Sequence, residues 1–540
     1  DATILWDTTN DEFDFSHPIN VAGKVTSTGT SVFASLDISG DIDVDGTTNL
    51  DIVDIDGAVD MASTLAVGGA VTVTGDTIKI DSANQAFYTA DRGGSSSYAI
   101  NRYYTAGTEN WRVGLLNDST SNFHIYDVVA SASRLSIGTD GSLSTPTAGT
   151  SNVRFGVNAG NSITSGGTYN TVVGDEAGTD ITTGDSNTGV GYGSLNETTT
   201  GGSNTAIGVN SLEANTTGSN NTALGVQALD TNTTASNNTA VGYQSLYANT
   251  TGAYNIAIGN YAVDANTTAN YNIGIGYNAL TSEASGTSNV GIGHAALEDS
   301  NGANYNTAVG YGSLRNNTTA DNNTAVGYNS LLANTTGAAN TAVGYAALLA
   351  NTTAANNTAV GFAALSVNTT GTQNIAIGTN ALDANTTASN NVAIGVNSLG
   401  VNTTGAANTG LGHETLIANT TGASNVAVGK NALRANTTAD NNTAVGYASL
   451  GANTTGTQNV AVGFNALDAQ TTEGFNTAIG SQAGSANTTG SGLVAVGYQA
   501  ADANTTGDFI TAVGYQALGG NSTGASNTAL GYYALLANTT

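Results

Sequence analysis

The acidic and histidine side chains are the residues of this chain that could carry out catalysis. Cleavage of a glycan needs two carboxylates a few ångströms apart in one groove. From residue 151 onward the chain has 19 Asp and Glu, which we interpret as scattered, with no repeated pair. The four histidines, His17, His124, His294 and His413, lie far apart in the sequence. We therefore expect no catalytic residues and no cofactor, and a protein that is not an enzyme.

One acidic segment resembles the start of a calcium-binding loop. Residues 41–46 read Asp-Ile-Asp-Val-Asp-Gly, but the twelfth position of the loop is Ile52. A calcium loop of this kind needs a bidentate Glu there. The alternation of Asp with Ile and Val favours a strand with one acidic face. We expect no metal site within the chain, and calcium bound between chains stays an alternative.

A 17-residue repeat organises most of the chain. The string Asn-Thr-Ala-Val-Gly recurs, and its glycine returns at this constant interval from Gly174 to Gly531, which gives 22 units in unbroken register. The spacing from Gly156 to Gly174 is longer by a single position, so a slightly longer unit precedes the series. Units of constant length that stack on one another are typical of solenoids. A disordered tract would not be expected to keep its phase over so many units.

Positions counted from this glycine predict the strand and the core of each coil. The residue three before it is always Thr, Ile or Val, and the residue one before it is always Val, Ile or Leu. β-Branched residues two apart predict a strand whose side chains at these two positions face a core. Leu stands four after the glycine in 18 of the 22 units and predicts a second inward wall. The Asn-Thr-Thr-Gly or Asn-Thr-Thr-Ala that follows predicts a corner, because Asn and Gly tolerate positive φ.

The predicted fold class is therefore all-β, a parallel β-solenoid (β-roll) of 17-residue coils. At a strand spacing of about 4.8 Å the coils would form a rod of about 100 Å. Three regions are expected: a β-rich stem at 1–83, a small β module at 84–150 and the solenoid at 151–540. Short alternating strands with Gly turns fit the stem, and Pro146 marks the join to the solenoid.

The column two before the glycine predicts contact with another chain. It holds only Ala, Gly and one Val, as at Ala342, Ala376 and Gly410. Because it lies between two residues expected to face inward, strand alternation turns it away from its own core. Small apolar residues on an outward face imply a closely packed neighbour. That neighbour is either a second chain or another wall of the same coil, and we favour a second chain, because a long thin rod exposes much surface for its volume.

The residue after the glycine is aromatic in 12 of the 22 units. Examples are Tyr311, Tyr328, Tyr345 and Phe362, and the column also accepts Lys430, so it faces water at least in part. Such rings either stack on one another between coils or form a stripe that binds a surface by stacking on sugars. We favour the ladder and keep the binding stripe as the functional alternative.

Two asparagine positions have a structural interpretation and a functional one. Asn stands four before the glycine in 20 of the 22 units, and we interpret it as an amide ladder between coils. The Asn-Thr-Thr corners, from Asn215 onward, also match the N-glycosylation sequon. The corner interpretation is preferred, because Asn favours turns.

Charge and composition exclude several classes of function. The net charge is −29, only 9% of the residues are charged, and there is no cysteine. A chain with so few Lys and Arg lacks the cations that contacts to nucleic-acid phosphates need. No apolar run approaches the length of a membrane span. We expect no nucleic-acid partner and no membrane insertion.

The repeat resembles known fibre proteins. The segment 374–378, Asn-Ile-Ala-Ile-Gly, is similar to the head repeats of trimeric autotransporter adhesins, in which Asn-Ser-Val-Ala-Ile-Gly units form a left-handed β-roll in a trimer. The full unit resembles repeats of phage and bacterial tail-fibre proteins more closely. Segments 36–76, 110–114 and 122–127 are similar to stem segments of marine phage fibres.

This resemblance implies a structural or adhesive fibre, trimeric and located outside the cell or on a virion. The expected function is that of a phage tail fibre, which projects from the virion and contacts a host surface glycan or protein. A bacterial surface adhesin is the alternative. An ice- or crystal-surface-binding solenoid is a further alternative from another class, although the Thr column that would support it shares its position with Ile and Val and is expected in the core.

Overall fold

The computed structural model describes residues 4–7, 12–15, 22, 99–116, 122–139, 143–144 and 151–540. The chain divides into two compact units, Asp1–Tyr88 and Thr89–Thr540. In the first unit, β1 (Ile4–Asp7) and β2 (Glu12–Phe15) pair antiparallel. The remainder of the expected stem, including the acidic segment 41–46, lies outside the described residues apart from position 22.

An antiparallel sheet of five strands lies within the range expected for the small β module. Its order is β3-β4-β5-β6-β7. Arg112 Nε donates to Glu109 Oε1 at 2.8 Å, and Arg134 Nη2 donates to Asp127 Oδ2 at 2.8 Å. The strands are β3 (Ala99–Thr105), β4 (Thr108–Leu115), β5 (Phe123–Asp127), β6 (Ala132–Ile137) and β7 (Leu143–Ser144).

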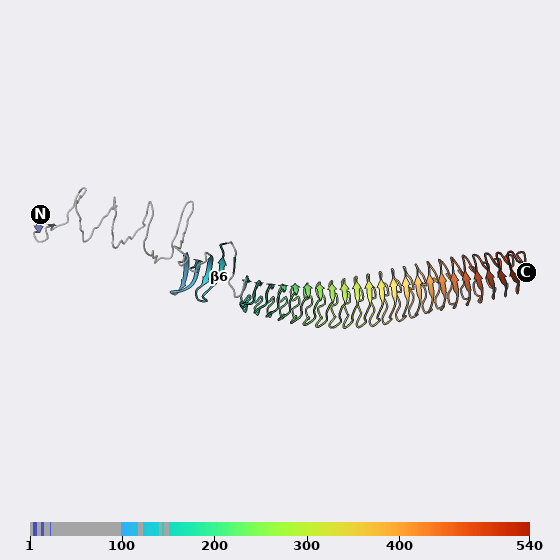
Figure 1. Cartoon of the computed structure of the whole chain (residues 1–540), viewed down its shortest axis with the longest axis horizontal. Coiled ribbons are helices and arrows are strands. Elements are labelled where there is room, and N and C mark those ends of the chain that lie inside the picture. Colours follow the sequence, from blue (N-terminus) through green and yellow to red (C-terminus); the bar gives the residue numbers. More distant parts are fainter. Residues whose placement is uncertain are drawn as a thin grey trace. The chain divides into compact units, whose positions relative to one another are not determined.

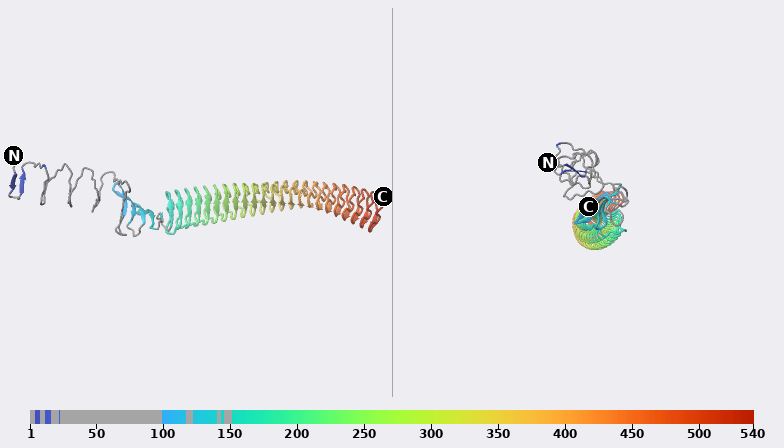
Figure 2. Two further views of the ribbon diagram at one scale, coloured as in Figure 1. Left: turned by 90° about the horizontal axis from the view of Figure 1, so that it is seen from above. Right: turned by 90° about the vertical axis from the view of Figure 1, so that its left-hand side faces the viewer.

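The predicted parallel β-solenoid is confirmed for residues 151–540. Figures 1 and 2 show its strands stacked in one row, one strand per coil. Each strand pairs in parallel with the equivalent strand of the next coil, as Thr341, Ala342 and Val343 pair with Thr358, Ala359 and Val360. The described residues contain no α-helix. The 23 strands are β8 (Val153–Phe155), β9 (Thr171–Val173), β10 (Thr188–Val190), β11 (Thr205–Ile207), β12 (Thr222–Leu224), β13 (Thr239–Val241), β14 (Ile256–Ile258), β15 (Ile273–Ile275), β16 (Val290–Ile292), β17 (Thr307–Val309), β18 (Thr324–Val326), β19 (Thr341–Val343), β20 (Thr358–Val360), β21 (Ile375–Ile377), β22 (Val392–Ile394), β23 (Thr409–Leu411), β24 (Val426–Val428), β25 (Thr443–Val445), β26 (Val460–Val462), β27 (Thr477–Ile479), β28 (Val494–Val496), β29 (Thr511–Val513) and β30 (Thr528–Leu530).

The side of the strand that faces the core is the opposite of the predicted one. In every strand from β9 to β30 the middle residue is buried, and the two residues that flank it are partly or fully exposed. Ala342 is completely buried, whereas Thr341 and Val343 are half-buried. The β-branched columns therefore form the outer face of the sheet, and the alanine column faces the interior.

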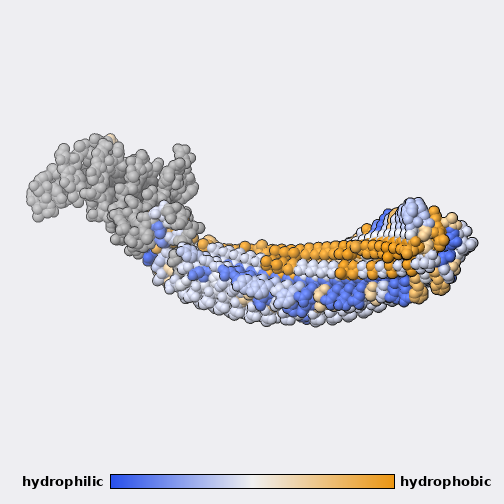
Figure 3. Space-filling model, turned by 45° about the vertical axis from the view of Figure 1, so that its right-hand side comes forward, coloured by the Kyte–Doolittle hydropathy of each residue, from blue (hydrophilic) through white to orange (hydrophobic). Residues whose placement is uncertain are grey.

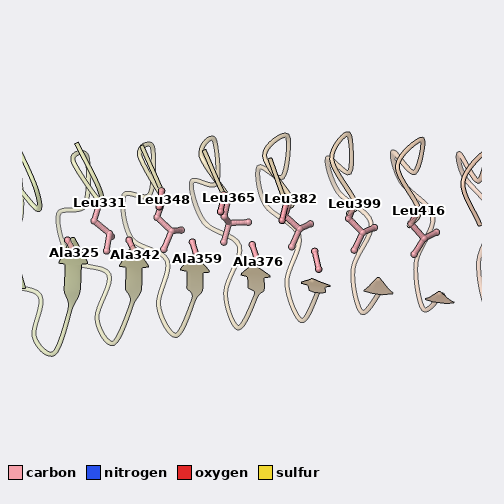
Figure 4. Close-up of a cluster of buried hydrophobic side chains, with 14 of the residues drawn as sticks. Ala325, Leu331, Ala342, Leu348, Ala359, Leu365, Ala376, Leu382, Leu399 and Leu416 are labelled. Carbon is pink, nitrogen blue, oxygen red and sulfur yellow. The ribbon is translucent and has the colours of Figure 1, made fainter. Parts of the chain in front are cut away.

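The interior of each coil is thin. Figure 4 shows the strand alanines, among them Ala342 and Ala376, facing a row of leucines that includes Leu348 and Leu365. A Cβ added to Gly410 would lie 2.5 Å from Ser398 Oγ and 2.9 Å from Thr415 Oγ1, which are too close for a stable contact. Elsewhere in this column an alanine Cβ is accommodated, and these alanines pack in one buried cluster with the leucines of their own chain.

The leucine wall consists of turns, not of strands. Leu348 has φ 52°, and most of the other leucines of this column share that left-handed conformation. A bulky residue in this region is strained, and the complete burial of Leu348 offsets that cost. The repeat glycine is also conformationally special, because Gly344 has φ +136° and an added Cβ would overlap the carbonyl oxygen of Gly361 in the next coil.

Asparagines hold the corners together. Asn351 Nδ2 donates to Asn334 Oδ1 at 2.9 Å in the preceding coil and to its own corner at Ala354 O at 3.0 Å. The predicted ladder of the second asparagine column is present as well, since the backbone N of Asn357 donates to Asn340 Oδ1 at 3.0 Å. These bonds satisfy polar groups that have no strand partner.

Candidate interaction surface

The outer sheet face is an extended, uncharged feature of the described surface. We define it as the two columns three and one before the repeat glycine, on strands β9 to β30. No residue in these columns is charged, because they contain only Thr, Val, Ile and Leu. Ile375 and Ile377 are each 38% exposed, and Leu411 is 44% exposed. Figure 3 shows a continuous hydrophobic band along the solenoid.

The residues predicted to pack between chains do not lie on this face. Ala342 and Ala376 are fully buried within their own chain, and Gly410 is buried as well. They have no surface to offer a partner, so their assignment to an inter-chain contact is wrong. The close neighbour that small side chains imply is the leucine wall of the same coil, which was the alternative interpretation.

The aromatic column forms a ladder beside the strands. Tyr311, Tyr328, Tyr345 and Phe362 stack in sequence with ring centroids 5.1–5.3 Å apart and interplanar angles of 6–11°. His294 extends the stack at 4.9 Å from Tyr311. Because neighbouring rings cover one another's faces, the interior rings present only their edges to solvent. Binding of a surface by these residues stays a prediction, and for the interior rings it would have to use ring edges and phenol hydroxyls.

The corner asparagines are inaccessible. Asn334 and Asn351 are completely buried, and their amide nitrogens donate hydrogen bonds within the solenoid. A glycan on such a nitrogen would remove these bonds and displace the adjacent coil. The folded solenoid therefore supports the corner interpretation of the sequon.

Acidic residues recur at one position of the coil. The sequence interpretation missed this recurrence. Asp230, Asp264, Asp383, Asp468 and Asp502 all lie at the fifth position after the repeat glycine. Burial raises the pKa of each of them, to about 6 for Asp264. These five residues are separated in the sequence by whole multiples of the repeat length. That spacing was the signal that could have revealed the column. Acids at equivalent positions stack in one column even when they are far apart in sequence.

One pair in this column brings two carboxylates together. Glu213 and Asp230 lie on successive coils, and burial together with the charge and hydrogen bond of Glu213 raises the pKa of Asp230 to about 7. A shared proton between neighbouring carboxylates explains a shift of this direction. The pair is the feature of the described solenoid that most resembles a proton-transferring site.

A polar notch of about 250 Å³ opens elsewhere on the solenoid. It lies where Ala448 and Gly451 take positions that hold Asn431 and Arg434 in the preceding coil. Arg434 Nε lies 3.4 Å from Glu414 Oε2, and Asp468 lines the other side. Its residues could accept a small polar group, since Asn431 Oδ1 is buried without a hydrogen-bond partner.

Two other kinds of site are absent from the described part of the chain. No three His, Asp or Glu side chains there are grouped so that they could hold a metal ion. Nor does that part include a helix with the length and apolarity needed to cross a bilayer. No family model, curated protein or solved structure matches the chain.

Proposed function

We propose that this chain forms the shaft of an extended structural and adhesive fibre. In this proposal it is a phage tail fibre that projects from the virion and contacts the host surface. The observation that carries the proposal is the parallel sheet from β8 to β30, whose register is the same at every step. Such a sheet extends in one direction and gives each coil the same surroundings. This property suits a part that spans distance and withstands load.

The fibre is proposed to be a homotrimer located outside the cell. Its uncharged outer sheet face, with an unbroken column of Val, Ile and Leu, supports self-association, because extended apolar patches are rare on monomeric proteins. The polyanionic character of the chain, with a net charge of −29, suits a partner that is neither nucleic acid nor an anionic bilayer. A host glycan or surface protein is the proposed target.

Electron microscopy tests this function directly. Purified protein imaged by negative stain is expected to show thin rods, and antibodies against the solenoid are expected to label fibres on virions. Labelling of a bacterial cell surface instead would favour the adhesin alternative. Labelling of neither particle would contradict both.

The proposal includes the absence of enzymatic activity. It is supported by the position of the Glu213–Asp230 pair, which does not line the polar notch at Gly451. Incubation of purified protein with host surface polysaccharide is expected to release no reducing ends. Release that disappears in Asp230→Asn would assign a glycan-cleaving activity to this pair.

One observation favours a second function. The Thr column, which was expected in the core, lies on the outer sheet face, with Thr324, Thr341 and Thr358 in register at successive coils. The argument against an ice- or crystal-binding surface therefore no longer holds. Thermal hysteresis of a solution of the protein would support this function, and its absence would remove it.

A further inference from the structure

We infer that the outer sheet face is the surface through which copies of this chain associate. The inference rests on the proposed self-association and names the face that makes it. The columns predicted from sequence are excluded, because Ala342 and Ala376 are already covered by their own coil. The residues beside them in the strand are the ones that remain uncovered.

The chemistry of this face is that of an interface core. Its residues are Thr, Val, Ile and Leu throughout, whereas the charged residues of the chain are all elsewhere. Depletion of charge at the centre of a patch distinguishes interfaces from ordinary surface. The residue after the glycine stands just beyond the face, and the exposed tyrosines that hold this position in many coils suit an interface margin, where one end of the ring is apolar and the hydroxyl meets water.

The area is sufficient for a stable complex. With 22 coils at about 4.8 Å and a width of about 10 Å for two side-chain columns, the face covers about 1,000 Å². A specific interface of ordinary size needs about 800 Å² from each partner. Coverage of half-exposed residues such as Ile375, Ile377 and Leu411 over this length would therefore match a stable assembly.

The repeat identifies the partner as a second copy of the same chain. Side chains recur on the face once per coil, because every strand pairs in the same register with the next. A partner with a different spacing would lose its match within a few coils. A parallel copy has the same spacing and meets equivalent side chains at every step. A continuous apolar band along the solenoid, as in Figure 3, is what such a partner would cover.

The test compares two triple variants of the full chain by size-exclusion chromatography with light scattering. The first carries Val326→Glu, Val343→Glu and Val360→Glu on the outer sheet face. The control carries Thr319→Glu, Thr336→Glu and Thr353→Glu, which are exposed corner residues at the same spacing. Both variants introduce one Glu in each of three successive coils, so the repulsion among the introduced charges is the same in the two variants. Circular dichroism checks that both remain folded.

The parent and the control are expected to show the same multiple of the 53.5 kDa chain mass. The outer-face variant is expected to show a lower multiple or a dissociation constant raised at least tenfold. An outer-face variant that associates like the parent would overturn the inference and leave the fibre proposal standing. A monomeric parent would overturn both this inference and the proposed homotrimer, and would point to another occupant of the face. Location on a virion is tested separately by antibody labelling.

Discussion

Asn351 and Asn334 are joined by their side-chain amides across adjacent coils, with Nδ2 of Asn351 2.9 Å from Oδ1 of Asn334. Both residues are completely buried. The same bond recurs between most neighbouring corners, and two of the places where it is missing show what it contributes. Where Glu283 or Gln470 takes the place of Asn, Oδ1 of the preceding Asn266 or Asn453 is buried without a partner.

Replacement of Asn351 by Ala should therefore destabilise its coils. It leaves the buried Asn334 Oδ1 without its donor, at a cost of about 1–3 kcal/mol, and it removes one of the two amide donors to Ala354 O, the other being Asn340 Nδ2. We expect faster hydrogen exchange in residues 334–371, measured by mass spectrometry. Thr353→Ala changes an exposed residue of the same corner and serves as the control. Equal exchange in the two variants would show that the ladder does not stabilise the corner.

The repeat glycine should tolerate no side chain. Gly344 has φ +136°, and a Cβ there would overlap the carbonyl oxygen of Gly361. Gly344→Ala is expected to lower the free energy of unfolding of neighbouring coils by on the order of 2–4 kcal/mol, because it combines backbone strain with a clash against backbone.

Gly400→Ala is the matched comparison for Gly344→Ala. Gly400 has no left-handed φ, and the nearest atom to an added Cβ is 3.4 Å away. Limited proteolysis of both variants measures local opening. Cleavage of the Gly344 variant no faster than that of the Gly400 variant would refute the steric argument.

The two sides of one strand should respond in opposite ways to a charge. Ala342→Asp places a carboxylate among leucines and is expected to destabilise its coil by several kcal/mol. Val343→Asp places the same group on the outer sheet face and is expected to leave hydrogen exchange of the strand amides of its own coil near the parent value. The sequence-based expectation was the reverse, with Val343 in the core.

Comparable loss of protection in both of these variants would contradict the observed orientation of the strand. Comparison at low protein concentration keeps the effect of Val343→Asp on association separate from its effect on the coil. The two residues are adjacent in one strand, so differences in local sequence or position along the solenoid do not enter the comparison.

The sequence predicted the repeat, the strand position, the corner and the buried leucine column. These follow from the constant spacing of the repeat and from backbone positions that accept few residue types, such as the one that Gly344 occupies at φ +136°. The orientation of the strand was missed, because large β-branched residues were assigned to the core and small ones to the outside. The coil is too thin for that arrangement, and only Ala or Gly fits opposite Leu348.

A signal for the correct orientation was present in the sequence. Thr occupies the position three before the glycine in 14 of the 22 units, and a buried hydroxyl would need a partner each time. The left-handed turn at Leu348 had no such signal, because Leu does not favour positive φ. It arises from tertiary packing. The coupling of Glu213 with Asp230 also depends on stacking of coils and becomes visible only when the acids are aligned by the repeat.

Stability near Asp230 should depend on pH in a defined direction. Burial and Glu213 raise its pKa from 3.8 to about 7, so the protonated carboxyl favours the folded coil. A raised folded-state pKa gives stabilisation that is complete below about pH 4 and is lost as pH rises through about 7. We expect slower hydrogen exchange in residues 205–241 at pH 5 than at pH 8, after correction for the intrinsic pH dependence of exchange.

Asp230→Asn is expected to remove this difference and to stabilise the coil at pH 8 by on the order of 2–4 kcal/mol. Asp299→Asn changes an exposed acid and is expected to retain the parent profile. Protection of residues 205–241 that is equal at the two pH values in the parent would show that the two carboxylates do not share a proton.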